Sequence, residues 1–90
     1  MPKLICNYGI HFTEMAQKYR DTIEMKGTRL HDLINLLDEK YKGFKNELID
    51  PATGKLATKN MILVEREKEN TSPIFSLDSE LRDGDILTIF

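Results

Sequence analysis

This sequence contains one Cys, two His and 15 Asp or Glu residues, but none of them has a recognised catalytic spacing. Cys6 is a potential nucleophile, but it lies in an alternating apolar stretch, which favours a buried packing thiol. His11 has no Cys, His or carboxylate at a convincing metal-ligand spacing, so a surface or loop histidine is favoured over a ligand or base. Asp83 and Asp85 flank Gly84, and turn chemistry explains both. We therefore predict no catalytic residue, no metal site and no cofactor.

The composition narrows the class of protein further. The 90 residues are 31% charged and 40% hydrophobic, which predicts one soluble globular domain over residues 1–90. The net charge of −2 gives no electrostatic case for binding nucleic acid or an anionic membrane. There is no signal peptide, no membrane-spanning apolar run and only one cysteine, so a cytoplasmic location is expected. Phosphate-loop, Gly-x-Ser-x-Gly, His-Glu-x-x-His and Cys-x-x-Cys motifs are absent, so we do not expect an enzyme.

The strands are predicted from alternating or continuous apolar residues. The first two are expected to pair antiparallel through an irregular connection over 9–18 with one helical turn. The charged segment 65–72 is expected to be a solvated loop or hairpin tip. The strands expected are 3–8, 19–25, 61–64, a short edge strand at 73–75, and a central strand at 86–90.

One strongly amphipathic helix is predicted between the second and third strands. Thr28 is its expected N-cap, and Gly43 suits the C′ position beyond its end. A second short helix is expected at 44–50, followed by a turn at 50–54. The apolar stripe at helical period consists of Leu30, Leu33, Ile34, Leu37 and Tyr41.

These elements give the order β-β-α-β-β, an α+β fold in which one main helix packs across a mixed sheet. The right-handed crossover rule allows the last strand to lie beside the first and parallel to it. The predicted core is Leu4, Cys6, Ile23, Met25, Leu30, Leu33, Ile34, Leu37, Leu63, Leu87 and Ile89.

The C-terminal stretch Leu81-x-Asp83-Gly84-Asp85-x-Leu87-Thr88-Ile89-Phe90 resembles the end of the ubiquitin-like MoaD/ThiS sulfur-carrier family. The resemblance implies a ubiquitin-like β-grasp fold in which the Asp-Gly-Asp turn leads into the last strand. In that family a short Pro-containing tail ending in Gly-Gly follows. The sequence as given stops at Phe90. Either it is shortened, or the sulfur chemistry has been lost, or a further segment is added elsewhere.

The resemblance also implies a function. An ATP-dependent enzyme would adenylate the C-terminal carboxylate, and a thiocarboxylate would form and donate sulfur for molybdopterin, thiamine or a related product. The alternative is a β-grasp interaction or regulatory module with no sulfur-carrier chemistry. A third, weaker option is an accessory subunit of a larger oxidoreductase. Because the carboxylate of the 90-residue chain sits on a bulky residue at a strand end, we expect that chain itself not to accept sulfur.

A partner surface is predicted on the sheet face away from the helix. If Leu87 and Ile89 pack under the helix, Thr88 and Phe90 must face away from it. Ile5, or Ile62 and Val64, could extend an apolar patch there. A single surface Phe is ordinary in itself, but the resemblance places Phe90 against an adenylating or activating enzyme, or a synthase large subunit.

Overall fold

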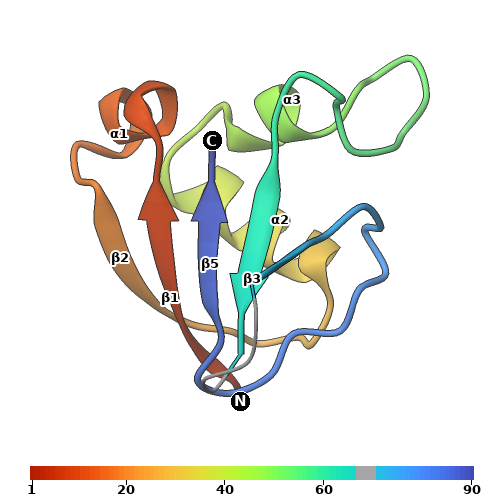
Figure 1. The fold of residues 1–90 in the computed structure, drawn as a ribbon. Helices are drawn as coiled ribbons and strands as arrows, with labels where there is room; N and C mark the ends of the chain where they lie inside the picture. The colour runs from red at the N-terminus through yellow and green to blue at the C-terminus, as the bar shows by residue number, and fades with distance from the viewer. Residues whose placement is uncertain (67–70) are drawn as a thin grey trace.

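The computed structural model describes residues 1–66 and 71–90, so part of the predicted loop at 65–72 lies outside the described residues. A five-stranded mixed sheet packs on one face against the main helix (Figure 1). None of the helices in the described ranges is long and apolar enough to cross a bilayer. The helices are α1 (Ile10–Ala16), α2 (Leu30–Lys40) and α3 (Phe44–Leu48). The strands are β1 (Lys3–Tyr8), β2 (Arg20–Glu24), β3 (Ile62–Glu65), β4 (Ser72–Pro73) and β5 (Ile86–Ile89).

Strand β5 occupies the centre of the sheet, as predicted. The strand order is β2-β1-β5-β3-β4, with β5 parallel to β1 and antiparallel to β3. Figure 1 shows β5 between these two neighbours, with the C-terminus at the end of the sheet that carries α1 and α3. A strand with neighbours on both sides keeps all its backbone hydrogen bonds inside the sheet, which explains its apolar sequence.

The core lies between the sheet and α2. Every residue predicted for it is buried except Leu63, which is half-buried and lies on the other face of the sheet. The structure adds an aromatic group that the prediction missed. The Phe44 ring lies 5.6 Å from the Tyr8 ring and 5.2 Å from the Phe12 ring, between centroids. These contacts join α1 and α3 to β1 at the C-terminal end of β5.

Two local predictions for the first 25 residues need correction. The connection after β1 contains a seven-residue helix, α1, rather than a single turn. Its buried residues Phe12 and Ala16 are four apart, and Gln17 ends the helix in the left-handed conformation at φ 61°. The second strand was predicted to begin at residue 19, but it begins at Arg20, and Tyr19 is 75% exposed.

The ends of α2 also differ from the prediction. The N-cap is Arg29 rather than Thr28, and the Asp32 carboxylate accepts the backbone N–H groups of both residues, at 3.1 and 3.2 Å. At the other end, Gly43 does not cap α2 at C′. It has φ 107° and is the N-cap of α3, a conformation for which glycine is the suitable residue.

The Asp-Gly-Asp turn fixes the start of β5, as turn chemistry predicted. The carboxylate of Asp83 accepts the backbone N–H of Lys3, and the N–H of Gly84 donates to the Lys3 carbonyl. Asp85 is fully buried and accepts two hydrogen bonds of 2.9 Å from the Arg66 guanidinium and one of 2.8 Å from the Arg82 amide. Burial alone would raise the pKa of Asp85, but these hydrogen bonds and the two positive charges hold that pKa below its usual range.

The opposite end of β5 passes close to Gly9, in the turn between β1 and α1. The N–H of Gly9 donates to the Ile89 carbonyl at 2.7 Å. A Cβ on Gly9 would lie 2.5 Å from the Phe90 Cβ and 3.1 Å from its Cα. Glycine is therefore required here because any side chain would push the C-terminal residue out of place.

Replacing Ile34 by Asp should unfold the protein, because the change places a charge in the fully buried interface between α2 and the sheet. The cost of several kcal/mol is comparable with a total stability of about 5–15 kcal/mol. The matched control is Asn35→Asp, on the exposed side of the same helix. Circular-dichroism melts of the two variants should differ sharply. Equal melts would contradict the core position of Ile34.

Replacing Gly9 by Ala should destabilise the protein by about 1–3 kcal/mol, through overpacking against Phe90. The double variant Gly9→Ala with Phe90→Gly removes the closest contact and should recover much of the loss. Urea unfolding of the four proteins in this mutant cycle measures the coupling between the two sites. Additive effects would show that the close approach has no energetic consequence.

Candidate docking surface

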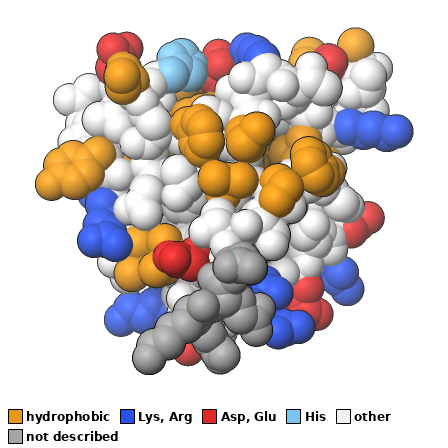
Figure 2. All heavy atoms as spheres, in the orientation of Figure 1, with side chains coloured by type: hydrophobic (Ala, Val, Ile, Leu, Met, Phe, Trp, Pro, Cys, Tyr) orange, Lys and Arg blue, Asp and Glu red, His pale blue; other side chains and the backbone are white. Residues whose placement is uncertain are grey.

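The sheet face away from α2, here called the open face, carries a continuous row of side chains over the three central strands. Asn7 of β1, Thr88 of β5 and Leu63 of β3 are registered side by side. Ile5 and Ile86 form a neighbouring pair across β1 and β5. All five are half-buried. Figure 2 looks onto this face and shows hydrophobic side chains gathered over β5 and β3.

The most exposed apolar residues of this face are Met61 and Phe90. The N–H of Phe90 donates to the Met61 carbonyl at 3.0 Å, and the N–H of Met61 donates to the Phe90 carbonyl at 2.6 Å. This pair extends the β3–β5 ladder by one step beyond the assigned strands. Met61 is 48% exposed and Phe90 is 49% exposed. Two large apolar side chains are thus held together in water at the end of the central strand.

Two residues predicted for this patch lie on the opposite side of the sheet. Ile62 is registered with Ile89 and Val64 with Leu87, so both side chains face α2, and Ile62 is only 3% exposed. The structure places Ile5, Thr88 and Phe90 on the open face, as predicted. On β3 it is Met61 and Leu63 that join them, because neighbouring strand residues point to opposite faces.

A cluster of three polar side chains borders the end of the sheet at which β5 ends. The carboxylate of Glu47 on α3 accepts hydrogen bonds from Lys59 Nζ at 3.2 Å and His11 Nε2 on α1 at 3.1 Å. The hydrogen bond from Lys59 and, to a smaller extent, the hydrogen bond from His11 hold the pKa of Glu47 below its usual value. His11 is exposed and hydrogen-bonded to Glu47, and within the described residues no group of three His, Cys, Asp or Glu side chains could hold a metal.

Cys6 is a packing thiol, as predicted. It is fully buried opposite Asp21 in the β1–β2 pair, and burial raises its pKa to about 12, with the Asp21 charge acting in the same direction. Asp21 is itself buried and accepts hydrogen bonds from the hydroxyls of Tyr8, at 3.2 Å, and Tyr41, at 2.5 Å. Because the thiol stays protonated, this cluster stabilises the edge of the core rather than supplying a nucleophile.

The sequence and the fold were compared with those of known proteins. No protein-family model matches the sequence, and no curated protein matches it. A solved structure described as molybdopterin converting factor, subunit 1, from Pyrococcus furiosus is 25% identical, with a TM-score of 0.72 over 100% of this chain and 97% of that chain.

Two further solved structures match at lower identity, and these show the fold alone. Small archaeal modifier protein 1 of Haloferax volcanii is 18% identical, with a TM-score of 0.71 over 100% of this chain and 97% of that one. The Amycolatopsis orientalis BexX/CysO complex contains a chain that is 22% identical, with a TM-score of 0.69 over 97% of this chain and 92% of that one. The predicted resemblance is confirmed at the level of fold: this chain has the ubiquitin-like β-grasp structure of its neighbours, among them a molybdopterin converting factor subunit.

Proposed function

We propose that this protein is a MoaD/ThiS-like sulfur carrier that docks on a protein partner through the open face. The observation that carries the proposal is the exposed Met61–Phe90 pair, held at the end of the central strand in a chain that aligns end to end with a molybdopterin converting factor subunit. In this role the protein is the carrier, and an adenylating enzyme is the partner that supplies the ATP-dependent chemistry.

The composition of the open face supports a protein partner. An apolar centre bordered by charged groups is the usual anatomy of a protein interface, and here the centre is Met61, Leu63 and Phe90. Glu47, Lys59 and His11 provide polar groups at the adjoining end of the sheet. The neighbouring CysO chain was solved in complex with BexX, which supports the view that this fold presents a docking surface.

The backbone of Phe90 limits where the reactive carboxylate must lie. Both its N–H and its carbonyl oxygen are hydrogen-bonded to Met61, so residue 90 is held within the sheet. One extended residue spans at most about 3.3–3.6 Å, so a carboxylate on Phe90 has little reach into an active site of another protein. We therefore propose that sulfur transfer requires a flexible extension after Phe90, while docking does not.

Replacing Phe90 by Ala should weaken the complex with a MoaD/ThiS-type adenylating enzyme from the same source by about 2 kcal/mol or more, as expected for a central aromatic anchor. The effect on folding should be smaller, because Phe90 is already half exposed. Tyr19→Ala is the matched control, since Tyr19 is 75% exposed and precedes β2, the edge strand on the other side of the sheet from β3. Isothermal titration calorimetry measures the affinity of each variant for the enzyme. Equal affinities for wild type and Phe90→Ala would remove Phe90 from the interface.

The sulfur chemistry should appear only when a tail is present. Incubated with ATP, a sulfur donor and the adenylating enzyme, the 90-residue polypeptide should keep its mass. The same polypeptide with a Gly-Gly extension should gain the difference between sulfur and oxygen at its C-terminus. Intact-mass spectrometry followed by fragmentation locates the change. Docking without a mass gain in either polypeptide would favour the alternative, an interaction module with no carrier chemistry.

A further inference from the structure

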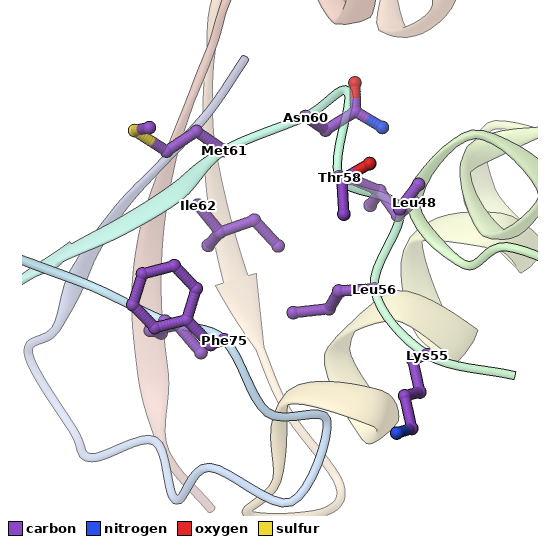
Figure 3. A pocket seen from close by; sticks show the side chains of 10 residues that line it. Leu48, Lys55, Leu56, Thr58, Asn60, Met61, Ile62 and Phe75 are labelled. Atoms are coloured by element: carbon purple, nitrogen blue, oxygen red, sulfur yellow. The ribbon is translucent and has the colours of Figure 1, made fainter. Parts of the chain in front are cut away.

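A second apolar surface lies beside β3, between the loop 54–60 and the segment 74–78. The two segments enclose a hollow of about 360 Å³, shown in Figure 3. In that view Leu56 and Phe75 approach the hollow from opposite sides, with Ile62 between them and Met61 pointing away. A second hollow of about 390 Å³ shares Lys55, Leu56 and Phe75 with the first. Together the two hollows form an elongated groove.

The floor of the groove is preformed. Leu48, Ile62 and Ile74 are buried and lie on α3, β3 and the segment after β4. The N–H of Ile74 donates to the Ile62 carbonyl, and the N–H of Ala57 donates to the Leu48 carbonyl, both at 2.8 Å. These hydrogen bonds hold the two walls against the sheet and α3. A ligand would therefore find the apolar floor already shaped, without a large ordering cost.

The walls carry one large aromatic ring and one charge. Phe75 is 82% exposed, so its ring is available to cover an apolar group placed in the hollow. Of the described residues that line the first hollow, only Lys55 is charged. Within the described residues no carboxylate lies within ion-pair distance of it, whereas Lys59 is paired with Glu47. Asp78, the other charged residue of the groove, lines only the second hollow.

We propose that this groove binds a peptide segment of a partner protein, in which a large apolar residue is followed or preceded by an acidic one. The apolar side chain would fill the hollow against Ile62 and Phe75, and the carboxylate would pair with Lys55. A polar small molecule fits less well, because such sites place several convergent polar groups around the ligand. Met61 lines the first hollow as well as pairing with Phe90, but Phe90 lines neither hollow, so the proposal can be tested apart from the sulfur-carrier function.

A random-peptide phage library selected against the immobilised 90-residue protein tests the proposal. The enriched peptides should share an apolar residue next to Asp or Glu. Selection against Lys55→Glu should replace the acidic residue by a basic one. That reversal identifies the charge contact, because a variant that had merely lost its fold would enrich no consensus.

A synthetic peptide of the enriched sequence then separates the two surfaces. Phe75→Ala should weaken its binding by about tenfold or more, and Lys55→Ala by about two- to fivefold. Phe90→Ala should leave it unchanged. Amide NMR spectra of each variant serve as the control that the variant is folded. The absence of any consensus, a consensus without an acidic residue, or binding lost in Phe90→Ala but kept in Phe75→Ala would each overturn the proposal.

Discussion

The position of β5 between β1 and β3 decides which side chains are buried and which are available to partners. Leu87 and Ile89 face α2, so Ile86, Thr88 and Phe90 must face away. A shift of one residue in either pairing would move the whole set to the other face and place Thr88 in the core. The open face therefore depends on the same register that builds the hydrophobic core.

Both ends of β5 are fastened to other parts of the chain, which makes that register specific. At the start, the Asp-Gly-Asp turn bonds to Lys3, and buried Asp85 is satisfied by Arg66 and the Arg82 amide. At the end, Ile89 bonds to Gly9 and Phe90 to Met61. A buried carboxylate is tolerated only with such partners. The ion pair thus links Arg66, the residue after β3, to the strand that ends at the candidate docking surface.

Sequence patterns predicted the elements with a clear period and missed those set by distant contacts. The period of α2 and the alternation in β1 identified the main helix and the first strand. The run 61–64 is apolar at every position, so its sequence does not show which residues face inward; this is why Leu63 was assigned to the core and Ile62 to the patch. Likewise, α1 is too short to be predicted locally, because it is stabilised by packing between Phe12 and Phe44.

The groove was not predictable, because it unites α3, the loop 54–60, β3 and the segment after β4, which are adjacent only in the folded chain. Its exposed ring, Phe75, lies on the edge side of β3, whereas Phe90 lies on the open face beside Met61. Neither ring contributes fully to the core, so each can be changed at small cost to folding. The two surfaces meet at Met61, which pairs with Phe90 and also lines the first hollow. A partner that covers Met61 on the open face would therefore also reach the rim of the groove, whose floor is Leu48, Ile62 and Ile74.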